Sequence, residues 1–141
     1  MKALVAAALL LAATVAFCPM PVSAQNYRID PNRCGAIAYS PKTGHYGYAW
    51  NQPGRFAAEN IALKECGERD AKVLTWVRFG WAVLVIAEDK AYGFHEVHGD
   101  NASSKAAFDG ALKHLRQSSN ARVTTIITIC SGDVRPTVTK V

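Results

Sequence analysis

The feature that most constrains this chain is the repetition of one pattern in its two halves. Tyr46-Gly47-Tyr48 in the first half resembles Tyr92-Gly93-Phe94 in the second. An apolar segment precedes each motif, a helix-like segment with alanines at matching positions follows it, and a further apolar segment closes each half. Repetition of this kind is typical of a structural unit that is used twice. The sequence therefore predicts two strand–strand–helix–strand units, over about residues 34–79 and 81–130.

Turn and cap residues delimit the expected elements. The segment Ser40-Pro41-Lys42-Thr43-Gly44 has the composition of a turn between two strands. The first helix is expected over about residues 54–65, and the second from Asn101 or Ser103, either of which can cap it, to about Arg116.

Each unit then supplies three strands and one helix. The third strands are expected over residues 72–79 and 122–129, and the tail after Ser131 is expected to be irregular because of Gly132 and Pro136. Two such units placed edge to edge would form a mainly antiparallel six-stranded sheet. With both helices on one face of that sheet, the fold class is a two-layer α+β domain.

The first 24 residues have the features of a secretory signal peptide. Lys2 supplies a positive charge, Ala3 to Phe17 is uncharged and apolar, and Val22-Ser23-Ala24 places small residues before a cleavage site at Gln25. The apolar run is shorter than the roughly 20 residues that a membrane-spanning helix needs. We therefore expect an exported protein with one domain over residues 25–141 and no membrane insertion after cleavage.

The charge of the chain excludes some classes of partner. The formal net charge is +5, but the basic residues are scattered rather than gathered in a stripe. A nucleic-acid interface needs a concentrated basic surface, so no nucleic-acid partner is expected. No glycine-rich phosphate loop follows a predicted strand, and we expect no nucleotide or other cofactor.

The expected domain contains an odd number of cysteines, Cys34, Cys66 and Cys130. In the alignment of the two halves, Cys130 corresponds to Gly80 and Cys34 to Trp81, which are neighbours in the turn that joins the two units. A pseudo-twofold axis would bring Cys34 and Cys130 to the equivalent corner. A Cys34–Cys130 disulfide is therefore expected, with Cys66 as a buried free thiol.

Three segments of the first half resemble a known family. They are Gly35-Ala36-Ile37-Ala38-Tyr39-Ser40-Pro41, Tyr46-Gly47-Tyr48-Ala49-Trp50, and the alanine-rich helix that ends at Cys66-Gly67. Lys72-Val73-Leu74-Thr75-Trp76-Val77-Arg78 continues the likeness to domain-of-unknown-function family 4189, which consists of small exported bacterial proteins. The resemblance implies a fold and an export route, and it implies no activity. Family members tend to carry further cysteines near the positions of Ala71 and Trp81. This chain lacks those additional cysteines.

The densest polar cluster is His95-Glu96-Val97-His98. A zinc-protease motif needs two histidines four residues apart on a helix, whereas these are three apart at the end of a predicted strand. Strand alternation directs His95 and His98 to opposite faces, so no metal site is expected.

The aromatic residues are the better candidates for a site. Tyr46, Tyr48 and Trp50 alternate along a strand and therefore share one face, and Trp76 and Arg78 share a face of another strand. Tyrosine, tryptophan and arginine are enriched at binding hot spots. If the helices cover the small-residue face, these five side chains lie on the open face; the alternative is that the aromatics form a second small core.

These observations favour a monomeric, non-catalytic binding module of the bacterial periplasm or exterior. Its expected partner is a protein or a cell-envelope component, as for an immunity or inhibitor protein. The alternative is a small envelope hydrolase or metal-dependent enzyme that uses His95 and His98.

Overall fold

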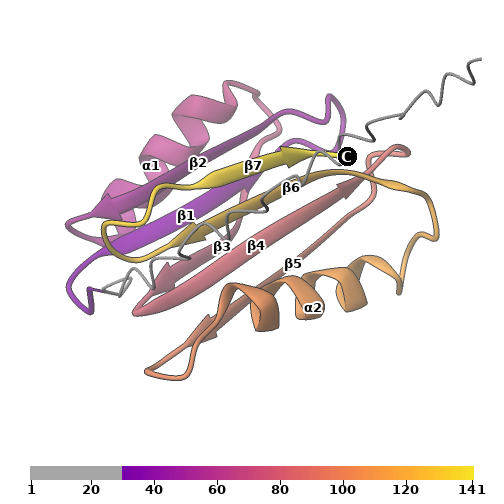
Figure 1. Cartoon of the computed structure of the whole chain (residues 1–141). Helices are drawn as coiled ribbons and strands as arrows, with labels where there is room; N and C mark the ends of the chain where they lie inside the picture. The colour runs from indigo at the N-terminus through magenta and orange to yellow at the C-terminus, as the bar shows by residue number, and fades with distance from the viewer. Residues whose placement is uncertain (1–29) are drawn as a thin grey trace, which may run out of the picture.

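The computed structural model describes residues 30–141, so the predicted signal peptide lies outside the described residues. The elements along the chain are β1 (Cys34–Tyr39), β2 (Tyr46–Gln52), α1 (Arg55–Cys66), β3 (Lys72–Arg78), β4 (Gly80–Ala87), β5 (Tyr92–His98), α2 (Ser104–Leu115), β6 (Val123–Cys130) and β7 (Thr137–Lys140) (Figure 1). The tail after Ser131 is not irregular as expected, because β7 pairs antiparallel with β6. Neither helix of residues 30–141 has the length and hydropathy of a membrane span.

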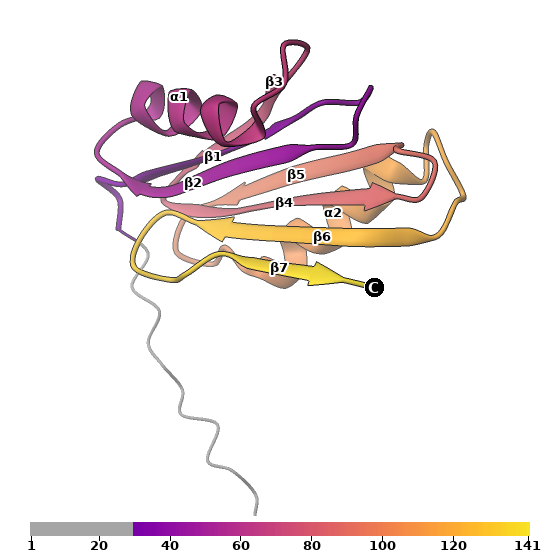
Figure 2. The same cartoon turned by 90° about the horizontal axis from the view of Figure 1, so that it is seen from above.

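The strands form two antiparallel sheets and not the single six-stranded sheet that was expected. One sheet has the order β2-β1-β3 and the other has the order β5-β4-β6-β7. The strands of the second sheet lie side by side in that order in Figure 2. In the first sheet β1 lies between β2 and β3, and in the second β4 lies between β5 and β6.

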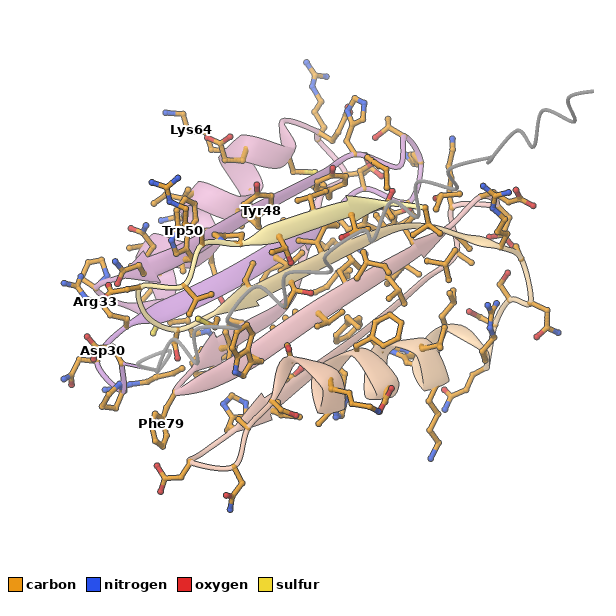
Figure 3. All side chains as sticks on the ribbon, in the orientation of Figure 1. Asp30, Arg33, Tyr48, Trp50, Lys64 and Phe79 are labelled. Carbon is orange, nitrogen blue, oxygen red and sulfur yellow. The ribbon has the colours of Figure 1, made fainter. Side chains whose placement is uncertain are left out.

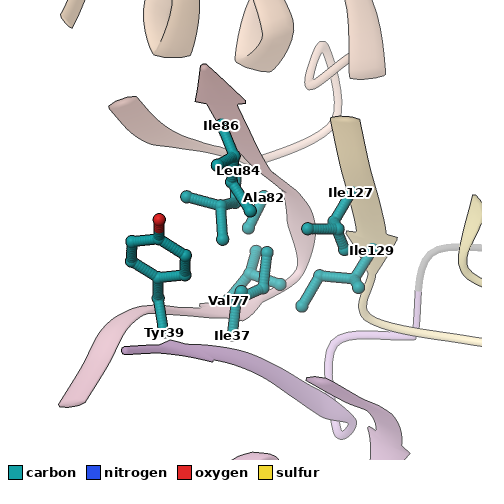
Figure 4. Packing of buried hydrophobic residues seen from close by; sticks show 8 residues of the cluster. All are labelled: Ile37, Tyr39, Val77, Ala82, Leu84, Ile86, Ile127 and Ile129. Carbon is teal, nitrogen blue, oxygen red and sulfur yellow. The ribbon is translucent and has the colours of Figure 1, made fainter. Parts of the chain in front are cut away.

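The two sheets pack face to face, with one helix on each outer side. Eight buried side chains from both sheets form the core between them: Ile37, Tyr39, Val77, Ala82, Leu84, Ile86, Ile127 and Ile129 (Figure 4). A second buried cluster joins the other face of β1 to α1, and a third joins the other face of β4 to α2. The prediction of two layers with both helices on one face is therefore wrong, whereas the α+β class is confirmed.

The burial of the central strands explains this arrangement. All six residues of β1 are buried, and so are seven of the eight residues of β4, Trp81 being the exception. A strand of nearly continuous apolar residues must be covered on both faces. Each helix covers one face of its own sheet, and the remaining apolar faces are removed from water by packing against each other.

Two glycines set how closely the helices approach the sheets. A Cβ atom on Gly47 would lie 2.1 Å from the carbonyl oxygen of Ala62 and 2.3 Å from the nitrogen of Cys66. A Cβ atom on Gly93 would lie 2.1 Å from the carbonyl oxygen of Ala111 and 2.4 Å from the nitrogen of Leu115. The two helices therefore cross β2 and β5 in the same way, with backbone packed directly on backbone.

Replacing Tyr39 with phenylalanine is expected to reduce the loss of stability in alkali. The Tyr39 ring is fully buried, and its hydroxyl donates to the carbonyl oxygen of Lys90 at 2.9 Å. Burial raises the pKa of Tyr39 from its ordinary value of 10.0 to about 12. The unfolded chain therefore loses this proton at a lower pH than the folded chain, and the free energy of unfolding falls as the pH rises from 10 to 12, by about 2 kcal/mol.

Denaturant unfolding at pH 9 and pH 12 measures this effect. Tyr39→Phe should be about 1 kcal/mol less stable than the wild type at pH 9, because it lacks the hydrogen bond to Lys90. Between the two pH values its stability should fall by about 2 kcal/mol less than that of the wild type. An equal fall in both proteins would show that Tyr39 does not titrate as described.

Candidate functional site: an open strand edge beside a helix

Strand β2 lies at the edge of its sheet, and part of its backbone points away from β1. Ser40 N donates to His45 O at 2.9 Å, which fixes the alternation of hydrogen-bonded pairs along the β1–β2 hairpin. In this register the pairs Tyr39/Tyr46 and Ile37/Tyr48 are the non-hydrogen-bonded ones. The N–H and C=O groups of Tyr46 and Tyr48 therefore point to the open edge.

The aromatic side chains of β2 are half-buried along the same edge. Tyr46 and Tyr48 pack against the core between the sheets, so the second sheet covers much of the face that was expected to be open. The ring centroids of Tyr48 and Trp50 are 6.4 Å apart, and the ammonium of Lys140 on β7 lies 5.0 Å from the centroid of Tyr46. Figure 3 labels Tyr48 and Trp50 on β2, beside α1.

A groove of about 370 Å³ runs between this strand edge and α1. Its walls come from five consecutive residues of β2, from Gln52, and from two residues of α1: Tyr46, Gly47, Tyr48, Ala49, Trp50, Gln52, Ile61 and Glu65. The Ile61 side chain is exposed although it is apolar, and Glu65 supplies a carboxylate. The groove thus combines aromatic and aliphatic surface with free backbone groups and one negative charge.

The other two predicted site residues lie elsewhere. Trp76 and Arg78 belong to β3, at the opposite edge of the same sheet. Trp76 packs with the cluster beneath α1, and the guanidinium of Arg55 lies 4.6 Å from its ring centroid. The side chain of Arg78 donates from Nε to the carbonyl oxygen of Pro31 at 2.9 Å. Of the five predicted residues, the structure therefore brings together Tyr46, Tyr48 and Trp50 alone.

The corresponding edge of the second sheet is closed. Ala87 N donates to Ala91 O at 2.8 Å, so the alternation along β4–β5 turns the N–H and C=O of Phe94 outward. His114 of α2 covers them, with its Nδ1 atom 3.3 Å from Phe94 N and 3.1 Å from Phe94 O. Depending on its tautomer, the imidazole accepts from the N–H or donates to the C=O. This role of His114 was not among the predictions made from the sequence.

The three described cysteines are buried free thiols, so the predicted Cys34–Cys130 disulfide is not present. Cys34 packs with the cluster beneath α1, whereas Cys130 lies opposite Trp81 in the second sheet. Cys66 is also beneath α1, where its Sγ is 3.4 Å from His45 O. Burial raises the pKa of all three thiols, which keeps them protonated and poorly nucleophilic at neutral pH.

His95 and His98 do not meet. His95 lies over Gly110 of α2, where its Cδ2 would be 2.3 Å from a Cβ atom on that glycine. His98 leaves the other face of β5, and its Nδ1 lies 2.9 Å from the carbonyl oxygen of Arg78. Across residues 30–141, no three His, Cys, Asp or Glu side chains form a group that could hold a metal ion.

A larger hollow of about 890 Å³ lies where the two hairpin turns meet, with Lys42, Lys90, Tyr92, Phe94 and His114 among its lining residues. Two of its charged groups already have partners. The ammonium of Lys90 donates to Lys42 O at 2.8 Å, and both carboxylate oxygens of Asp89 accept hydrogen bonds, from Ala91 N and Ser119 Oγ. These bonds hold the two turns together. Among the charged lining residues in the described part of the chain, the ammonium of Lys42 alone makes no such bond, and a single ammonium does not define a ligand.

Fold and groove together describe a small α+β domain with a groove along one strand edge. The chain belongs to the family described as Domain of unknown function (DUF4189), which matches residues 34–130. This confirms the family resemblance noted in the sequence.

Known relatives match parts of the chain. Protein Rv1269c of Mycobacterium tuberculosis is 50% identical over 58 residues, which are 41% of this chain and 44% of that protein. Uncharacterized protein Rv1813c of the same species is 36% identical over 81 residues, which are 57% of this chain and 52% of that protein. The chain thus spans about half the length of the curated relatives it matches. The NMR structure of Rv1813c covers 86% of this chain and 97% of its own, with a TM-score of 0.47 and 25% identity.

Proposed function

We propose that this protein is an exported, non-catalytic binding module that recognises a protein or cell-envelope component through the groove beside β2. The observation that carries the proposal is the alignment of Tyr46, Tyr48 and Trp50 along an open strand edge that faces a wall of α1. Aromatic side chains that are already partly ordered lose little entropy on binding, which is why such residues dominate binding energies.

The leader-like residues 1–24 support export, to the periplasm or the cell exterior. There the module would act as a monomer, and an immunity or inhibitor protein is the concrete form of such a role. The enzyme alternative draws no support from His95 and His98, whose side chains leave opposite faces of β5.

We also infer that the chain arose by duplication of one unit. The equivalent packing of Gly47 on α1 and of Gly93 on α2 supports this inference, as does the shared strand order of the two sheets. In this alignment Tyr48 corresponds to Phe94, and Glu65 to His114.

Trp50→Ala is expected to weaken capture of the partner about tenfold or more, since a hot-spot tryptophan contributes about 2 kcal/mol. The measurement is quantitative mass spectrometry of proteins that co-purify with the tagged full-length protein from its native envelope. Phe56→Ala is the matched control, because Phe56 is 79% exposed on α1 and does not line the groove. A partner retained equally by the wild type and by Trp50→Ala would show that the groove is not its binding site.

A further inference from the structure

The two units differ at one point that bears on binding. In the second unit His114 covers the outward N–H and C=O of Phe94. In the first unit the equivalent helix position is Glu65, whose side chain lines the groove. Within the described part of the chain, no side chain makes a hydrogen bond to the backbone of Tyr48. The same edge is thus closed in one unit and open in the other.

Unpaired strand edges are normally blocked, because they pair with other chains. Two other edges in residues 30–141 show such protection. Strand β7 is four residues long and carries Lys140, and β3 has an irregular register opposite Ile37 and Ala38 and charged residues at both ends. Strand β2 is seven residues long, and from Tyr46 to Trp50 it carries no charged residue. An open edge of this kind is the surface used for strand addition.

We propose that the groove beside β2 binds an extended peptide segment of a protein partner, which adds to the sheet as a strand next to Tyr46–Trp50. This inference rests on the proposed function and specifies its mode. Backbone hydrogen bonds to Tyr46 and Tyr48 hold the segment, and its side chains alternate between the aromatic side of β2 and the α1 side. Apolar residues suit Tyr48, Trp50 and Ile61, and a lysine or arginine on the α1 side suits the carboxylate of Glu65.

The charge of the groove favours a peptide over a second copy of this chain. Pairing of β2 with β2 about a twofold axis would bring a second Glu65 to the same wall of the groove. Like charges at such an interface are unfavourable, whereas a basic side chain in the peptide is complementary to Glu65. Self-association is therefore an outcome that the experiment must be able to detect.

The test uses the mature full chain and a panel of fluorescent hexapeptides in which valine alternates with threonine and lysine. Each peptide is made in three forms: unmodified, with N-methyl groups on its odd residues, and with N-methyl groups on its even residues. Only alternate amides of an added strand face β2, so one methylation pattern should weaken binding at least tenfold, and the other should leave it within about threefold. Binding is measured by fluorescence polarisation, and self-association by sedimentation.

Two variants of one exposed residue complete the test. Glu65→His should place an imidazole over the backbone of Tyr48, as His114 does over Phe94, and weaken binding at least tenfold. Glu65→Gln should lose only the charge interaction and weaken binding about two- to fivefold. Thermal unfolding of both variants verifies that they are folded.

Several results would overturn the proposal. They are equal binding of both methylated forms, undiminished binding by Glu65→His, failure of every peptide in the panel to bind, and dimerisation of the wild type that Glu65→His abolishes. The last result would assign the edge to a second copy. If Trp50→Ala weakens capture of a partner while both methylated forms bind alike, strand addition is wrong and the proposed function stands.

Discussion

Gly47→Ala is expected to lower the free energy of unfolding by about 3 kcal/mol, and Gly93→Ala should do the same. The added methyl group would lie 2.1 Å from a helix carbonyl oxygen in both cases. These contacts are with backbone atoms, so no side-chain rotation relieves them. The whole helix would have to move away from the sheet and would open the buried cluster beneath it.

Gly54→Ala is the matched control. A Cβ atom at Gly54 meets no atom within 4 Å, and its backbone is extended, with φ −169°. Alanine is a poorer helix cap than glycine, so a cost of about 1 kcal/mol or less is expected. Urea unfolding measures all three variants. If Gly47→Ala and Gly93→Ala cost no more than Gly54→Ala, the close approach of helix and strand described above is wrong.

Trp81→Cys is expected to form a disulfide with Cys130 when the protein is purified in air. The two residues are direct partners across β4 and β6. Ser131 N donates to Gly80 O at 3.1 Å, so the adjacent Trp81/Cys130 pair is of the non-hydrogen-bonded kind. In such pairs the Cα atoms are about 4.5 Å apart, which lies within the range of disulfides.

The bridge would close a loop of about 50 residues, worth roughly 4 kcal/mol in the chain-entropy model. Loss of the half-buried indole of Trp81 lowers the free energy of unfolding by about 2 kcal/mol, which offsets part of the gain from the bridge. Oxidised Trp81→Cys should therefore be about 2 kcal/mol more stable than the wild type, and it should become less stable than the wild type after reduction. Trp81→Ala, which has the same packing loss and no thiol, is the control. Thiol titration in denaturant checks the bridge, and a full complement of free thiols would contradict the strand register.

Local features of the chain were predictable from sequence because their causes are local. Ser103 was expected as a possible helix cap, and its Oγ accepts from Ala106 N at 3.1 Å. The first helix was expected over residues 54–65 and spans Arg55–Cys66. Gly47, on the small-residue face of its strand, lies where α1 crosses β2.

The arrangement of the two sheets was not predictable from these local signals, because it depends on what covers the apolar sheet faces that the helices leave uncovered. The continuous apolar run of β4 did indicate burial on both faces, which a two-layer fold cannot supply.

The sheet face on which Trp76 lies depended on the register between β1 and β3. Trp76 pairs with Ala36, which faces α1, whereas Tyr48 pairs with Ile37, which faces the other sheet. A direct comparison of Glu65 with His114 was the one sequence signal that distinguished the two edges.

Amide hydrogen exchange, followed residue by residue by NMR, tests without any ligand whether the β2 edge is open. The amide of Tyr48 is expected to exchange at least tenfold faster than that of Phe94, because solvent reaches the β2 edge and His114 covers the β5 edge. His114→Ala should raise the exchange rate at Phe94 toward that at Tyr48. Equally slow exchange at Tyr48 and Phe94 in the wild type would show that the β2 edge is already closed, and would contradict the site proposed here.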